Sequence, residues 1–136
     1  MFIVVDASVW VARLVSQDVF YAPVKEWMSA RIGEEDQFLA PSLLLAELGG
    51  AISRRTTPAL GLKAIQQVQN LPGLQLVEMD DSLVLEAAQL AAELGLRGAD
   101  STYVALATRL ALPLVTLDVD EGERARKRVK LMEISK

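Results

Sequence analysis

The sequence of 136 residues contains no cysteine and no histidine. The absence of cysteine excludes disulfide bonds, thiolate metal sites and cysteine nucleophiles. The absence of histidine removes the side chain that most often serves as a general base or as a zinc ligand. Any catalysis must therefore use carboxylates, hydroxyl groups, lysine, arginine or tyrosine.

The sequence also lacks the signals of export and membrane insertion. No apolar stretch approaches the roughly 20 residues that a membrane-spanning helix needs. The N-terminus has no basic segment and reaches Asp6 too early for a signal peptide. Repeats, linkers and low-complexity tracts are missing as well. We therefore expect a cytoplasmic protein with no membrane contact, folded as one domain over residues 1–136.

The composition is that of a folded protein, with 51% hydrophobic and 24% charged residues. The net charge of -4 argues against a protein that coats nucleic acid with a basic surface. It is compatible with a nucleic-acid enzyme whose acids are concentrated in a metal site.

Short apolar runs alternate with longer segments of helical periodicity. The expected strands are residues 2–5, 38–40, 74–77 and 112–117, with a short fifth one at 130–134. The expected helices are residues 7–15, 19–32, 43–54, 59–71, 80 or 81 to 94, and 99–110, with a further one beginning near Asp120. Apolar strands separated by helices predict a parallel sheet covered by helices on both faces.

Two acids follow strands directly. Asp6 ends the run FIVVD, and Asp118 ends LVTLD. Sites in open parallel sheets form outside the carboxyl ends of the strands, so both acids are expected at the same edge. Each of them can also cap the helix that follows. For Asp6 the two roles are compatible, because one oxygen can cap while the other faces a metal.

Two further acids lie in helical segments. Glu47 stands in LLLAELGGAI, which is apolar nearly all round, and no cation lies three or four positions away. A buried, unpaired carboxylate is costly or stays protonated, so a group outside this helix should compensate Glu47, unless it lies at the helix edge in water. Asp100 in GADSTYVALA can be a first-turn acid favoured by the helix dipole, with Arg97 as its partner.

Taken together, these acids suggest a carboxylate cluster without histidine or cysteine, which is the ligand set of Mg²⁺ or Mn²⁺. Ser8 and Thr116 each lie two residues from an acid, where a hydroxyl group can orient a carboxylate or hold a metal-bound water. Such ions bridge phosphate oxygens, so phosphodiester hydrolysis is the natural chemistry.

The motifs VVDASVW, PSLLLAELGGA, GADSTYVALA and LVTLD, in this order and over nearly the whole chain, resemble the PIN-domain ribonucleases, and most closely the VapC-type toxins of toxin–antitoxin pairs. The resemblance implies a three-layer α/β/α sandwich with a five-stranded parallel sheet. It implies a Mg²⁺-dependent endoribonuclease whose catalytic, metal-binding acids are Asp6, Glu47, Asp100 and Asp118. Relatives often carry an aromatic residue shortly after the last acid; here the run is DVDEG, which makes Asp120 an additional candidate.

Three alternatives are open at this point. The first is an RNA-processing nuclease of the same fold without an antitoxin. The second is a phospho-receiver domain, to which Asp80, Thr116 and Lys136 are superficially suited, although it leaves Glu47 and Asp100 unexplained. The third is a binding module without catalytic activity.

Two surfaces point to partners. The basic run contains Arg124, Arg126, Lys127, Arg128 and Lys130, which form either a solvated helix face or contacts to RNA phosphates. The helices in residues 7–32 carry more large apolar side chains than one face of a small sheet needs, unless these residues all fill the core. We therefore predict a homodimer packed through helices, and a second apolar groove for an amphipathic segment of an antitoxin. As the VapC resemblance suggests, a basic side chain of that segment could reach the acids.

Overall fold

Strands and helices alternate along residues 1–135, which are the residues that the computed structural model describes. In chain order the elements are β1 (Phe2–Val5), α1 (Ala7–Leu14), α2 (Tyr21–Gly33), β2 (Gln37–Pro41), α3 (Leu44–Arg55), α4 (Pro58–Gln69), β3 (Leu74–Val77), α5 (Asp81–Leu94), α6 (Gly98–Leu110), β4 (Leu114–Val115) and α7 (Val119–Ala125). Lys136, which the phospho-receiver alternative used, lies outside the described residues.

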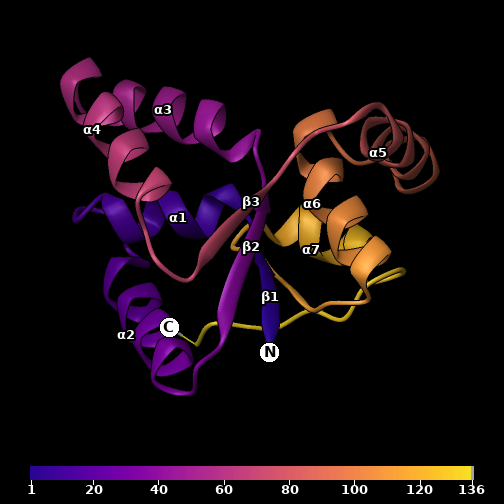
Figure 1. The fold of residues 1–136 in the computed structure, drawn as a ribbon, viewed down its shortest axis with the longest axis horizontal. Helices are drawn as coiled ribbons and strands as arrows, with labels where there is room; N and C mark the ends of the chain where they lie inside the picture. Colours follow the sequence, from indigo (N-terminus) through magenta and orange to yellow (C-terminus); the bar gives the residue numbers. More distant parts are fainter. Residues whose placement is uncertain (136) are drawn as a thin grey trace.

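The four strands form one parallel sheet in the order β3-β2-β1-β4. Helices α1 to α4 cover one face of the sheet and α5 to α7 cover the other (Figure 1). The central strand β1 is buried on both faces, as the apolar run FIVV predicts. The expected three-layer α/β/α class is confirmed.

The expected fifth strand is wrong, because residues 130–134 make only one parallel bridge, between Leu131 and Leu114. Two hydrogen bonds form it, from Leu114 N–H to the Lys130 carbonyl at 3.0 Å and from Met132 N–H to the Leu114 carbonyl at 2.8 Å. The neighbouring strand is also shorter than expected. The N–H groups of Leu117 and Asp118 donate to the hydroxyl groups of Ser8 and Thr116 instead of to a strand.

Most large apolar side chains of the first two helices fill the core. Trp10 contacts the edge of Phe38 and Trp27 stacks on the same ring, each with ring centroids 5.8 Å apart. Val9, Val24 and Met28 are buried as well. The number of apolar residues in this region is therefore explained by the core and does not by itself indicate a dimer.

Local signals fix the ends and the packing of the helices around the site. Asp80 caps α5, since its carboxylate accepts from Leu83 N–H at 2.8 Å, and Gly95 ends that helix at a φ of +70°. Helix α3 approaches α4 closely at Gly61, where an added Cβ would lie 2.8 Å from the Gly49 carbonyl oxygen.

Among residues 1–135 no helix is long and apolar enough to cross a membrane.

Candidate metal centre

Asp6 lies where β1 ends and α1 begins, and it has both roles that the sequence allows. Its Oδ2 accepts from Ser8 N–H at 3.0 Å, which caps α1, and from the Thr116 hydroxyl at 3.2 Å. The Ser8 and Thr116 hydroxyls are themselves 3.3 Å apart. The two hydroxyl residues predicted from the sequence therefore orient this buried carboxylate.

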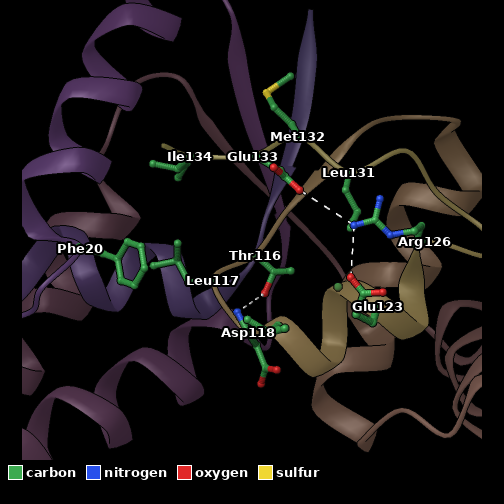
Figure 2. A pocket seen from close by; sticks show the side chains of 12 residues that line it. Phe20, Thr116, Leu117, Asp118, Glu123, Arg126, Leu131, Met132, Glu133 and Ile134 are labelled. Carbon is green, nitrogen blue, oxygen red and sulfur yellow. Dashed lines mark hydrogen bonds and ion pairs between the residues drawn. The ribbon is translucent and has the colours of Figure 1, made fainter. Parts of the chain in front are cut away.

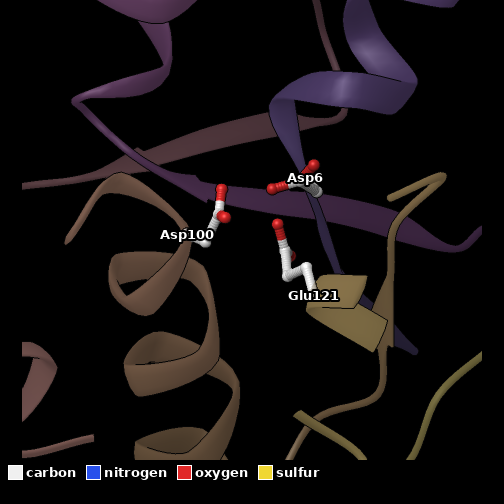
Figure 3. A group of neighbouring side chains, drawn as sticks. All are labelled: Asp6, Asp100 and Glu121. Carbon is white, nitrogen blue, oxygen red and sulfur yellow. The ribbon is translucent and has the colours of Figure 1, made fainter. Parts of the chain in front are cut away.

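Three acids from distant parts of the chain converge at this edge of the sheet. Asp6, Asp100 in the first turn of α6 and Glu121 in the first turn of α7 each offer a carboxylate oxygen, and these oxygens lie within 4.8 Å of one another. Figure 3 shows the three side chains pointing toward one another. Such a group of oxygens matches the ligands that a hard divalent cation prefers.

Glu121 is the most unusual member of the group and was not predicted from the sequence. Its side chain is only 1% exposed, and neither carboxylate oxygen has a hydrogen-bond partner within residues 1–135. Burial, and then the charges of Asp6 and Asp100, raise the pKa of Glu121 to about 11. Two buried oxygens without a donor are costly, and a cation between the acids would compensate them.

Glu47 in the first turn of α3 is half-buried and close enough to Asp6 and Asp100 to feel their charges, but it does not belong to the group of three acids whose oxygens converge. Its Oε1 accepts a hydrogen bond of 2.7 Å from the hydroxyl of the buried Tyr103. Burial raises the pKa of Glu47, Tyr103 lowers it, and the charges of Asp6 and Asp100 raise it further. The compensating group expected outside the helix is thus a tyrosine hydroxyl, and within residues 1–135 no cation pairs with Glu47.

Asp118 lies at the rim of the cluster and caps α7. Its Oδ1 accepts from Glu121 N–H at 3.0 Å, and its Oδ2 pairs with Arg97 at 2.7 Å. Arg97 also pairs with Asp100 at 3.1 Å, as the sequence suggested. Asp118 therefore caps a helix beside the converging acids, and Asp100, which is one of them, also forms the expected ion pair with Arg97.

Asp120 points away from the cluster. Its side chain is 75% exposed and pairs with Arg124 at 3.0 Å. Successive residues of a helix are rotated by about 100°, so only one of the neighbours Asp120 and Glu121 can face the core. The helical spacing of Glu121 and the buried Ala125 marks the inner face of α7 and could have identified Glu121.

The basic run is largely neutralised by surface acids. Arg124 pairs with Asp120, and Arg128 pairs with Glu93 at 2.6 Å. Arg126 contacts Glu123 and Glu133 beside a cavity of about 220 Å³ that the C-terminal segment helps to line (Figure 2). Within the described part of the chain, none of these arginines pairs with an acid of the cluster, which favours the interpretation as a solvated face.

Comparison with known proteins identifies the family. The family model described as PIN domain matches residues 3–127. The chain belongs to the PIN domain family. No curated protein matches the sequence. Asp80, on which the phospho-receiver alternative depended, caps α5.

Solved structures share the fold of this PIN domain at low sequence identity. The VapC20 toxin of Mycobacterium tuberculosis, described as cleaving the sarcin-ricin loop, has a TM-score of 0.80 at 15% identity, over 96% of this chain and 98% of that one. VapBC2 of Rickettsia felis, bound to a promoter DNA fragment, has a TM-score of 0.71 at 16% identity, over 99% and 100%. FitAcB of Neisseria gonorrhoeae has a TM-score of 0.68 at 19% identity, over 98% and 96%. The resemblance to VapC-type proteins is thus confirmed at the level of the fold.

Proposed function

We propose that this PIN domain is an endoribonuclease that depends on Mg²⁺ or Mn²⁺ and hydrolyses phosphodiester bonds of RNA. The observation that carries the proposal is Glu121, a buried carboxylate without a hydrogen-bond donor, held against Asp6 and Asp100. A divalent ion satisfies such a group, and the all-oxygen donor set suits Mg²⁺ or Mn²⁺. Membership of a family of nucleases supports the reaction class.

In this proposal Asp6, Asp100 and Glu121 hold the ion, and Glu47 and Asp118 flank it. The bound ion supplies Lewis acidity that activates a water and neutralises charge on the phosphate. The chain fixes the ligands in advance: Thr116 and Ser8 orient Asp6, and Tyr103 orients Glu47. Groups that orient ligands in this way determine both metal affinity and turnover.

Cleavage of a random-sequence RNA pool by the purified protein tests the proposal. We expect cleavage with Mg²⁺ or Mn²⁺, and none in excess chelator. The same pool with boiled protein and with the Asp6→Asn variant controls for a contaminating ribonuclease. Cleavage that persists in chelator would remove the metal from the mechanism, and a protein that leaves RNA intact under all these conditions would be a binding module.

Tyr103→Phe tests whether the tyrosine hydroxyl orients Glu47 for metal binding. The change removes only the hydroxyl that donates to Glu47, so the pKa of Glu47 should rise and its carboxylate should bind a cation less well. We expect cleavage to fall by about ten- to hundredfold, as is typical when an orienting partner is lost. Part of the activity should return as pH or Mn²⁺ concentration rises.

The matched control for this change is Tyr21→Phe. Tyr21 keeps its ring contacts with Arg13 and Lys25 when its hydroxyl is removed, and it is not part of the acid cluster. Equal losses in both variants, or no loss in Tyr103→Phe, would contradict the orienting role.

We further propose that the protein is the toxin of a toxin–antitoxin pair. Several solved structures with this fold are complexes named VapBC and FitAB. A groove of about 710 Å³ between α1 and α3 suits an amphipathic segment, because apolar residues line it and it opens onto Glu47 and Asp118. Its apolar lining includes Val11, Val19, Phe20, Ala46, Ala51 and Leu117. Arg54 and the ion pair of Asp18 with Arg55 line it as well.

A basic side chain of the antitoxin that passes Glu47 and Asp118 and reaches the three acids proposed to hold the ion would compete with the metal and inhibit the enzyme. A gene for a small protein next to the gene of this chain would distinguish a toxin from an RNA-processing nuclease without an antitoxin. Charge reversal at the cluster, as in Asp6→Lys, should weaken binding of that small protein.

A homodimer remains a proposal, and exposed apolar residues on the outer face of α5 are the best surface for it. Val84 and Leu85 are exposed there, and Arg109 of α6 contacts Ser82 and Glu86, which places the exposed Leu110 at the same end. We expect light scattering to show a dimer at micromolar concentration and a monomer for Leu85→Glu. Leu62→Glu, an equally exposed site on α4 in the other helical layer, is the control and should stay dimeric.

A further inference from the structure

One guanidinium group spans two acids at the rim of the metal centre. Arg97 Nε donates to Asp100 Oδ2 at 3.1 Å, and Arg97 Nη2 donates to Asp118 Oδ2 at 2.7 Å. Within residues 1–135, Arg97 is the one cation that forms an ion pair with any of the five acids Asp6, Glu47, Asp100, Asp118 and Glu121. Arg97 therefore places a positive charge directly beside the acid cluster.

The backbone of Arg97 is fixed, whereas its side chain is accessible. Gly95 ends α5 in the left-handed conformation, Leu96 is buried, and Arg97 itself is the N-cap of α6. The Arg97 side chain is 76% exposed. Ion pairs in water are weak and easily exchanged, so the guanidinium can leave these carboxylates without disturbing the fold.

We propose that Arg97 is a phosphate-binding residue whose partners change when the metal binds. In the metal-free protein it holds Asp100 and Asp118; when a divalent ion takes Asp100, the guanidinium is released to bind a phosphate of the RNA. The inference rests on the proposed function, and it assigns a substrate contact to a residue outside the acidic set.

Charge and geometry support this exchange. A divalent ion at Asp6, Asp100 and Glu121 neutralises Asp100 and repels the nearby guanidinium, so the ion and Arg97 compete for the same carboxylate. RNA brings new negative charge to the same place, and the planar fork of a guanidinium matches two phosphate oxygens. A residue that is accessible and close to the ion is well placed to bind this phosphate.

A purely structural role for Arg97 predicts the opposite effect on metal binding. If Arg97 only holds Asp100 and Asp118 in place, its removal disorders the site and weakens binding of the ion. If Arg97 competes with the ion, its removal strengthens binding. The sign of the change therefore separates the two roles without any measurement of activity.

The first measurement is a calorimetric titration of the metal-free full chain with Mn²⁺, in the absence of RNA. We expect Arg97→Gln to bind Mn²⁺ several-fold more tightly than the wild-type protein. Arg109→Gln is the control, since Arg109 lies at the other end of α6 and pairs with Glu86. Weaker or unchanged Mn²⁺ binding in Arg97→Gln would overturn the proposal.

The second measurement is steady-state cleavage at saturating Mn²⁺ and several salt concentrations, on the shortest RNA that the wild-type protein cleaves. We expect Arg97→Gln to raise KM about tenfold, because one charge-assisted hydrogen bond to the RNA is removed, with little change in kcat. The slope of log KM against log salt should fall by about 0.7, the value for one phosphate of a single strand that the protein no longer neutralises. Arg97→Lys should restore the salt slope, because an ammonium group also binds a phosphate oxygen.

The two measurements distinguish a failure of the Arg97 proposal from a failure of the proposed nuclease function. A wild-type protein that cleaves no RNA refutes the nuclease, while the Mn²⁺ titration still decides whether Arg97 competes with the ion. An active wild-type protein whose KM and salt slope are unaffected by Arg97→Gln refutes the phosphate contact alone. Should Arg97→Gln be unstable, Arg97→Ala removes the same charge from an exposed side chain and allows the same comparison of Mn²⁺ affinity and KM.

Discussion

Asp100→Asn is expected to abolish RNA cleavage while the fold remains intact. The change replaces a charged oxygen ligand by a neutral amide of the same size, which a hard cation binds poorly. The loss should be at least about a hundredfold, beyond the range typical for an orienting partner. In chelator the variant should melt at the same temperature as the wild-type protein or slightly higher, because one of several mutually repelling acids has been removed.

Asp120→Asn is the matched control for this result. It makes the same chemical change at an acid whose side chain is 75% exposed and directed to Arg124. We expect normal cleavage and normal Mn²⁺ affinity from this variant. Wild-type turnover of Asp100→Asn at limiting Mg²⁺ would contradict the assignment of Asp100 as a ligand, and a loss of turnover in Asp120→Asn would mean that α7 rearranges when the metal binds.

The layered fold could be predicted because its strands have an unambiguous pattern. FIVV is apolar throughout and is followed by an acid, which predicted both the buried strand β1 and the position of Asp6 at its carboxyl end. The fifth strand could not be predicted correctly from the same rule. Leu131 makes one bridge to β4, but β4 consists of Leu114 and Val115 only, so its outer edge is too short to pair a further strand.

The acids differ in how far the sequence could place them. Asp6 and Asp100 converge as expected, since the ends of the elements that carry them meet at one edge of the sheet. Glu121 was missed because four acids lie within the six residues 118–123, and only the start of α7 at Val119 decides which of them faces inward. Tyr103 was missed because a tyrosine in an apolar helix is indistinguishable from a core residue until its hydroxyl is seen against Glu47.

Glu121→Gln is expected to have opposite effects on stability and on metal binding. The pKa of Glu121 is raised to about 11, so in the metal-free protein the side chain must take up a proton on folding at neutral pH. Glutamine has nearly the same shape, needs no proton, and can donate its amide N–H to Asp6 or Asp100. We expect the free energy of unfolding in chelator at about pH 8 to rise by a few kcal/mol. Mn²⁺ affinity and RNA cleavage should both fall sharply.

The pH dependence provides the sharper test of this explanation. Burial raises the pKa of Asp6, Glu47 and Glu121 in the folded state, so the folded protein binds more protons than the unfolded chain above the ordinary carboxyl range. Stability in chelator must therefore decrease as pH rises from about 5 to about 8, and Glu121→Gln should flatten this decrease. Glu123→Gln, two residues along α7 with an exposed side chain, should leave the slope unchanged.

Metal should reverse this trend, because it binds the deprotonated carboxylates and replaces the protons. The rise in melting temperature caused by Mn²⁺ should increase with pH in the wild-type protein and be small at every pH in Glu121→Gln. A metal-free protein that becomes more stable between about pH 5 and pH 8 would show that a donor satisfies Glu121, so that no cation is needed at this position. Melting curves in chelator, with Mn²⁺ and for the variant therefore test whether the buried Glu121 carboxylate lacks a hydrogen-bond donor, which is the observation on which the proposed metal centre depends.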